Sequence, residues 1–141
     1  MSSIKPNPIQ GCFICAKCEG IQIVKFVDGK YSLPSKCRTE KCTSSMHIFD
    51  RLSPDTITVD WQKVKLQEII NDDRNDSGRI PRSVEVELTN HLVDSCVPGD
   101  VVQVAGIVKV MTTDEGKGKT NNMFIPYIDA NSVTLWYFLS F

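Results

Sequence analysis

Long hydrophobic runs are missing from this sequence of 141 residues. The first eight residues, Met-Ser-Ser-Ile-Lys-Pro-Asn-Pro, are polar and interrupted by proline, so they do not form the apolar segment of a secretory signal peptide. No apolar stretch approaches the roughly 18 residues that a membrane-spanning helix needs. We therefore expect a protein without membrane contact in a reducing compartment, where cysteines are more often metal ligands than disulfides.

The sequence also lacks a strong excess of charge of either sign. Its formal net charge is −1, with 41% apolar and 23% charged residues, which is typical of one globular domain or of one domain with a small insertion. Any contact with nucleic acid would have to come from local basic patches rather than from the field of the whole chain.

Complete catalytic motifs are absent as well. The segment 118–120, Gly-Lys-Thr, matches the end of a phosphate-binding P-loop, but Thr113 stands where the first glycine belongs and a strand pattern follows. A zinc-dependent deaminase needs a His-x-Glu segment, and neither His47 nor His91 begins one. Because no nucleophile with a base is evident either, we expect no independent enzymatic activity for this chain.

The patterns that are present predict short β-strands. Residues 21–27 are β-branched and aromatic, and Asp-Gly at 28–29 predicts a hairpin turn with a returning strand at 31–33. Alternating apolar residues favour a strand over 56–66, although a helix over 61–70 is the alternative. Further elements are expected as strands at 84–88, 101–110 and 123–128, and as a helical turn within 89–96. Gly106 predicts a bulge, and Pro126 predicts a bulge or a sheet edge.

Six cysteines are present, and four of them form two pairs at spacings typical of zinc ligands. Two residues separate Cys15 from Cys18, and four separate Cys37 from Cys42. Four thiolates complete a tetrahedral zinc site without an open position, so such a site is structural rather than catalytic. We predict these four cysteines as the zinc ligands, since Gly20 allows the first pair to turn tightly.

Two alternatives to this ligand set stay open. Cys12 stands three residues before Cys15 and could form the first pair with it. His47 stands five residues after Cys42 and could replace one thiolate. The sixth cysteine, Cys96, lies among apolar residues and is expected to be a small buried side chain.

Several segments, taken in order, resemble the minichromosome maintenance (MCM) helicases. The cysteine region is similar to the zinc ribbon of that family through Phe13–Cys18, Gln22 and Tyr31–Pro34. The later similar segments are 63–68, 78–82, 92–100, 104–108 and 127–132, so the resemblance covers residues 3–133. Segments 79–84 and 92–100 are most similar to the eighth paralogue of the family, which acts with the ninth in recombinational repair.

This resemblance implies a mainly β fold, namely a five-stranded OB-fold barrel with an inserted zinc-ribbon hairpin. It implies 1–11 as a remnant of the first barrel strand or a linker, 12–50 as the ribbon and 51–133 as the OB-fold. Residues 134–141 form an apolar tail that departs from the family. The chain begins near the end of the first barrel strand, so the barrel lacks a strand unless the tail fills that position.

The resemblance also implies a function, that of a DNA-binding and oligomerising module of an ATP-dependent helicase in DNA replication and homologous-recombination repair. Its partners would be DNA, single-stranded in the first place, and MCM subunits, either copies of itself or the ninth paralogue, in a hexameric ring in the nucleus. Structural Zn²⁺ would be its cofactor, whereas ATP and Mg²⁺ belong to a separate AAA+ motor domain. The hairpin loop of the family that projects toward DNA matches 112–122.

We expect DNA phosphates to be contacted by basic side chains, namely Arg79, Arg82, Lys109, Lys117 and Lys119. The alternative for the whole chain is a zinc-ribbon module that binds only protein and has no affinity for DNA, which the near-neutral charge favours.

Overall fold

The computed structural model describes residues 1–69, 80–113 and 123–136. Within this part the chain consists of β-strands, loops and two one-turn 3-10 helices. It divides into two compact units. The ribbon unit is Pro6–Asp60, and the barrel unit combines Met1–Lys5 with the described residues from Trp61 on. None of the described helices is long and apolar enough to cross a membrane.

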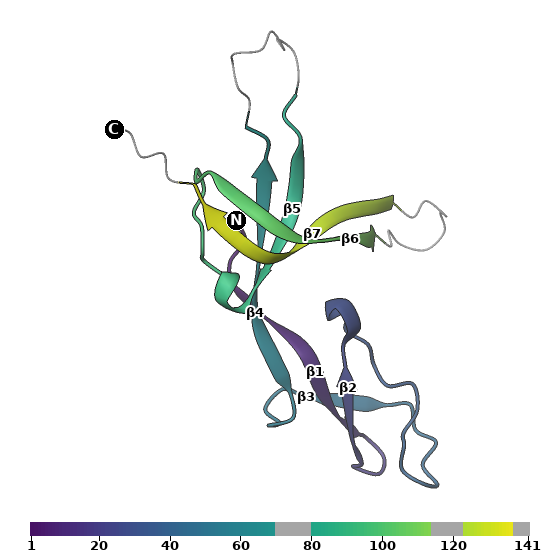
Figure 1. Ribbon diagram of the computed structural model, residues 1–141. Coiled ribbons are helices and arrows are strands. Elements are labelled where there is room, and N and C mark those ends of the chain that lie inside the picture. Colours follow the sequence, from purple (N-terminus) through teal and green to yellow (C-terminus); the bar gives the residue numbers. More distant parts are fainter. Residues whose placement is uncertain (70–79, 114–122, 137–141) are drawn as a thin grey trace. The chain divides into compact units, whose positions relative to one another are not determined.

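The hydrogen-bonded strand order is β2-β1-β4-β5-β7-β6, with β3 pairing to β1 (Figure 1). The ribbon unit contains β1 (Lys5–Cys15) except for its first residue, β2 (Ile21–Lys25), β3 (His47–Asp50) and the first residues of β4 (Ile57–Gln67). β1 pairs antiparallel with both β2 and β3, so that Phe13 stands opposite Gln22 on one side and opposite Phe49 on the other. β1 is therefore the central strand of the ribbon.

The hairpin predicted around Gly29 is wrong, because the returning strand expected at 31–33 does not form. β2 pairs with the preceding β1, and residues 31–33 form no strand. Gly29 has the positive φ of +65° that its turn requires, but this turn is the 3-10 helix η1 (Val27–Gly29) and leads into a loop. In this loop Tyr31 packs its ring against Phe13, Phe26 and Phe49.

These aromatic rings form the core of the ribbon unit. Phe13 is fully buried, and its ring centroid lies 5.4 Å from that of Phe49, 6.1 Å from that of Tyr31 and 6.2 Å from that of Phe26. Such pairs contribute about 0.5–1.5 kcal/mol each beyond their buried area. A side chain at Gly11 would place Cβ 2.8 Å from two of these rings, so the core requires glycine there.

The barrel unit has the strand β4 as predicted over 56–66, and the helical alternative for 61–70 is wrong. Its other elements are β5 (Ser83–Thr89), the 3-10 helix η2 (Asn90–Leu92), β6 (Val102–Thr113) and β7 (Met123–Leu135). β5 pairs antiparallel with β4 and parallel with β7, while β6 pairs antiparallel with β7. Because β7 inserts between β5 and β6, the chain follows a Greek-key path, as the OB-fold prediction requires.

The core of the barrel unit lies on one face of these strands. Val86 and Leu88 are fully buried on alternate positions of β5, as expected for a strand with one wet face. Around them pack Val64, Leu92, Cys96 and Ala130. Cys96 is only 8% exposed, which confirms the prediction of a small buried side chain, and burial raises the pKa of its thiol.

Residues 1–5 attach beside β4 through polar contacts. The N–H of Ser2 donates to Lys63 O at 2.8 Å, and Lys63 N–H donates to Ser2 Oγ at 2.8 Å. The buried amide of Gln62 bonds both to Ser2 O and to Asp94, whose own N–H donates back to Gln62 Oε1 at 3.0 Å. This network satisfies the hydrogen-bonding groups of the Gln62 side chain, a residue that is only 3% exposed.

The bulge predicted at Gly106 is confirmed. The register shifts between Ala105, opposite Ser132, and Gly106, opposite Ala130, so that Asn131 is the extra residue. Any Cβ at Gly106 would lie 2.9 Å from Ala130 Cα, which leaves room only for glycine.

Pro126 stands one residue before the part of β7 that pairs with β5, which agrees with the predicted edge position. At the other end of β7, Thr134 and Leu135 pair with Gln103 and Val102. These two residues of the tail therefore extend β7. The alternative that the tail replaces a missing first barrel strand is wrong for them. Residues 137–141 lie outside the described part.

Candidate metal centre

The first cysteine pair sits where β1 ends. Cys15 is the last residue of that strand, and the chain then turns so that Cys15 N–H donates to Gly20 O and Glu19 N–H donates to Cys15 O, both at 3.0 Å. Glu19 adopts the left-handed conformation with φ 58°. This tight turn brings the side chain of Cys18 back beside that of Cys15.

The second cysteine pair lies in the loop between η1 and β3. Cys37 N–H donates to Ser44 O at 3.0 Å, and Cys42 N–H donates to Thr39 O at 3.1 Å. Lys41 takes a left-handed φ of 68°, which closes the loop around four intervening residues. Ala16 N–H donates to Met46 O at 3.0 Å and ties this loop to the first turn.

The structure brings the four predicted sulfur atoms together within 4.8 Å of one another. Cys15 Sγ lies 3.8 Å from Cys42 Sγ, and Cys18 Sγ lies 3.5 Å from Cys37 Sγ. A tetrahedral zinc ion with Zn–S distances of about 2.3 Å has sulfur–sulfur edges of about 3.8 Å. The donor set and its spacing therefore fit one metal ion held by four thiolates.

Neither alternative ligand belongs to this group. Cys12 and Cys15 are three positions apart on β1, so their side chains point to opposite faces of the strand, and Cys12 is buried at 2% exposure. His47 stands opposite Cys15 in the strand register, but its ring lies outside the four-sulfur group. Its Nδ1 lies 3.2 Å from Ser45 O.

Backbone hydrogen bonds prepare part of this site for metal. The N–H groups of Cys18 and Lys17 lower the pKa of Cys15 to about 6, despite its desolvation. The Thr39 hydroxyl, followed by Gly20 N–H, lowers the pKa of Cys18. Both cysteines are thereby biased toward the thiolate, which is the form that binds metal.

The pKa of Cys42 is shifted in the opposite direction, which favours its protonated thiol. A hydrogen bond from Ser44 N–H favours its thiolate, but burial and the neighbouring sulfurs outweigh that bond and raise its pKa to about 11. Four adjacent thiolates repel one another without a cation, so a bound divalent ion must displace a proton here.

Thr39 supports the cluster and was not identified from the sequence. Its hydroxyl lies 3.5 Å from Cys18 Sγ and 3.4 Å from Cys37 Sγ. A Cβ added at Gly20 would collide with that hydroxyl and lie 3.2 Å from Cys18 Sγ. Gly20 thus provides space for the cluster, while the left-handed turn is made by Glu19. The sequence signal that could have identified Thr39 is its position between the two cysteines of the second pair.

Of the predicted DNA-contacting residues, the structure describes Arg82 and Lys109, which both belong to the barrel unit. Arg82 is exposed just before β5, and its N–H donates to Glu68 Oε2 at 3.2 Å. Lys109 on β6 forms an ion pair with Asp129, Nζ to Oδ2 2.8 Å, and is about one quarter exposed. Arg79, Lys117 and Lys119 lie outside the described residues.

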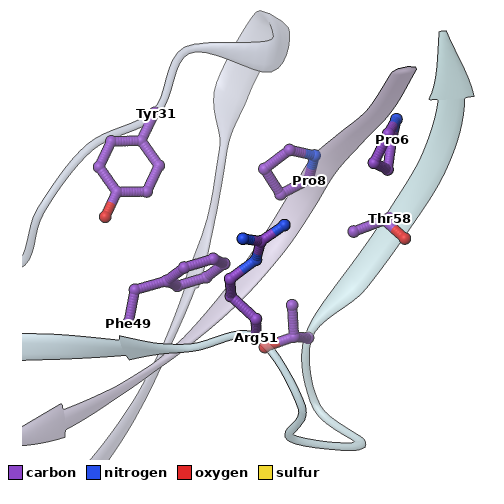
Figure 2. A pocket seen from close by; sticks show the side chains of 7 residues that line it. Pro6, Pro8, Tyr31, Phe49, Arg51 and Thr58 are labelled. Carbon is purple, nitrogen blue, oxygen red and sulfur yellow. The ribbon is translucent and has the colours of Figure 1, made fainter. Parts of the chain in front are cut away.

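A pocket in the ribbon unit was also missed by sequence reasoning. It encloses about 500 Å³ and is shown in Figure 2. Its lining residues are Pro6, Pro8, Tyr31, Phe49, Arg51, Thr56 and Thr58. They come from β1, the loop after η1, β3, the loop after β3, and β4, so no single sequence motif contains them.

Comparison with known proteins agrees with this architecture. The MCM OB domain family model matches residues 1–112. The chain is 50% identical over 137 residues to DNA helicase MCM8 of Gallus gallus and 48% identical over 136 residues to DNA helicase MCM8 of Homo sapiens. It is 39% identical over 139 residues to the probable DNA helicase MCM8 of Arabidopsis thaliana.

Each alignment covers 95–96% of this chain but only 16–17% of the relative. The predicted similarity to the eighth paralogue is confirmed by these relatives. With the match over residues 1–112 and a Greek-key barrel beside a four-cysteine ribbon, the chain belongs to the MCM family and carries its OB domain.

Proposed function

We propose that this chain is the DNA-binding and subunit-joining module of an MCM-type ATP-dependent DNA helicase. The observation that carries the proposal is the family match over residues 1–112, since the similar proteins are named DNA helicases. The chain spans about a sixth of their length, so ATP and Mg²⁺ are assigned to another part of the whole protein. The proposed setting is DNA replication and homologous-recombination repair in the nucleus.

Zn²⁺ is the proposed metal, with Cys15, Cys18, Cys37 and Cys42 as ligands. Four thiolates around one ion leave no open coordination position, so the ion would hold the ribbon in shape rather than activate a substrate. It would tie the end of β1 to a loop that contains no strand of its own. Its binding free energy would add directly to the stability of the ribbon unit.

Contact with DNA is proposed for the barrel unit through Arg79, Arg82, Lys109, Lys117 and Lys119. Lys109 already pairs with Asp129 in a partly buried position, so a phosphate would have to replace that carboxylate. Arg82, Lys117 and Lys119 are therefore expected to contribute more than Lys109 does. Other MCM subunits, either copies of this chain or the ninth paralogue, are the proposed protein partners in a ring.

The test is fluorescence anisotropy of a labelled oligothymidylate titrated with the zinc-loaded chain at two salt concentrations. We expect binding that weakens as salt rises, because phosphate contacts release counterions. A folded, zinc-loaded chain that shows no binding at low salt would contradict DNA binding by this module.

A second candidate is a module that binds only protein. It is favoured by the net charge of −1 and by exposed apolar side chains on β6 and β7, among them Val108 at 68%, Met123 at 67% and Phe124 at 66% exposure. It predicts self-association or partner binding with no response to DNA. Light scattering of the chain with and without the oligonucleotide distinguishes the two candidates.

A further inference from the structure

The pocket of the ribbon unit is built from rigid parts. Pro6 and Pro8 lie two positions apart on β1 and so share one face of that strand, while Phe49 is on β3 and Thr58 is on β4. Figure 2 shows Tyr31 and Phe49 at one side of the pocket, Pro6 and Thr58 at the other, and the guanidinium of Arg51 between them. The prolines fix the backbone on their side because their rings lock φ.

The loop that carries Arg51 is held by local hydrogen bonds. The hydroxyl of Thr56 donates to Asp50 O at 2.6 Å, and Cys12 N–H donates to the same hydroxyl oxygen at 3.2 Å. Leu52 N–H donates to Asp50 Oδ1 at 3.0 Å. These contacts fix both ends of the loop that follows β3, so Arg51 is presented from a defined backbone.

The pocket offers flat apolar surfaces together with one positive charge. Tyr31 is 53% exposed, and its ring packs edge to face against Phe49 at a centroid distance of 5.9 Å and an angle of 87°. Arg51 has no ion pair or hydrogen bond through its guanidinium among the described residues. A matching ligand therefore has a planar apolar part and an anionic part.

We propose that this pocket binds one nucleotide of a single DNA strand. The base would stack on the exposed ring of Tyr31, and the phosphate would pair with Arg51. The volume of about 500 Å³ suits a small flat ligand. This inference rests on the proposed function as a DNA-binding module and adds a base-stacking site in the ribbon unit.

A nucleotide fits this pocket better than a peptide strand does. Peptides that add to a sheet are held by backbone N–H and C=O groups of the strand beside them. Pro6 and Pro8 have no N–H to offer, so β1 lacks those donors along the pocket. A nucleotide needs an exposed aromatic ring for its base and an accessible cation for its phosphate, and Tyr31 and Arg51 are both exposed.

The first test is Arg51→Ala in the full zinc-loaded chain, with a labelled twelve-residue oligothymidylate as the probe. We expect affinity to fall about tenfold, as for loss of a charged hydrogen bond, and the salt slope to fall by about one. Lys25→Ala removes the same charge from an exposed position of β2 that does not line the pocket, and should leave both quantities near wild type.

The second test locates the ligand directly. In ¹⁵N–¹H spectra, hexathymidylate should shift the amides of Tyr31, Arg51 and Thr58. Tyr31→Leu should weaken binding at least about fivefold, because base–aromatic stacking is worth about 1–3 kcal/mol, while Tyr31→Phe should bind normally. An unchanged thermal midpoint shows that each variant is folded.

The outcomes separate the two proposals. DNA binding that Arg51→Ala leaves unchanged, with amide shifts only outside the pocket, overturns the nucleotide site but leaves DNA binding by the module intact. No binding by the folded, zinc-loaded wild type overturns both. Pocket amides that respond to a proline-rich peptide but not to hexathymidylate overturn the nucleotide site in favour of a protein ligand.

Discussion

Gly20 and Thr39 approach so closely that a Cβ on Gly20 would collide with the Thr39 hydroxyl. That hydroxyl is within hydrogen-bonding distance of two cysteine sulfurs on different pairs. The absence of a side chain at Gly20 thus leaves room for a group that lowers the pKa of Cys18 and favours its thiolate form.

Gly20→Ala should therefore weaken zinc binding about tenfold, the lower end for loss of an outer-shell contact. Thr39→Val should have a similar effect, and Thr39→Ser, which keeps the hydroxyl, should bind nearly as wild type. Competition with a chromogenic chelator measures the affinity. Equal affinities for Thr39→Val and Thr39→Ser would rule out the hydroxyl as the cause.

Cys37→Ser should abolish stoichiometric zinc and unfold the ribbon unit, because structural zinc contributes its binding free energy to folding. Cys12→Ala is the matched control, since Cys12 is a buried cysteine outside the four-sulfur group. It should be less stable but retain one zinc per chain, as measured by atomic emission. A Cys37→Ser protein with full zinc content would refute the proposed ligand set.

Zinc affinity should rise with pH between about 6 and 9. The lowered pKa of Cys15, about 6, means that this thiolate persists across the range and is lost only as pH falls through that value. Cys42, with its pKa raised to about 11, must release a proton on binding, so each rise in pH favours the complex. Chelator competition at several pH values measures this slope. A flat profile would mean that no proton is displaced.

Gly106→Ala should destabilise the barrel unit by about 1–3 kcal/mol, the usual cost of forcing an extra carbon into a packed site. The added Cβ would lie 2.9 Å from Ala130 Cα, on backbone that cannot easily move. Urea unfolding followed by tryptophan fluorescence reports on this unit, since Trp61 and Trp136 both belong to it. Ala105→Val, at the exposed neighbouring position, should cost little.

Lys117→Ala combined with Lys119→Ala should weaken DNA binding and reduce the salt slope by about two, one for each phosphate contact. Lys109→Ala should have a smaller effect, because that lysine already pairs with Asp129. The same anisotropy titration measures both variants. Loss of affinity from Lys109→Ala alone would show that its ion pair opens to DNA.

Local patterns predicted much of the fold. The alternation through Val84–Leu88 gave β5, because a half-buried strand repeats every two residues. Gly106 was identifiable because a glycine within a β-branched run marks a departure from regular pairing. The cysteine spacings selected the four sulfurs that the fold assembles, since the turns that bring such pairs together are short.

These local patterns did not predict which strands pair or which side chains pack together in the folded protein. The Asp-Gly signal before Tyr31 predicted a returning strand, but β2 pairs with β1 instead, and Tyr31 packs on Phe13 and Phe26 from a loop. The parallel pairing of β5 with β7 depends on which strands meet across the core, and alternation does not specify a partner. Arg51 had no motif around it, because its companions in the pocket come from distant segments.

The two units also differ in when they can form during synthesis. The ribbon unit is one contiguous segment, Pro6–Asp60, whereas Val86 of the barrel unit needs Ile128 as its strand neighbour. Because chains emerge from the ribosome amino-terminal end first, all four cysteines are available before β5 has been made. Metal loading of the ribbon can thus be cotranslational, while closure of the barrel has to wait until β7 has left the exit tunnel.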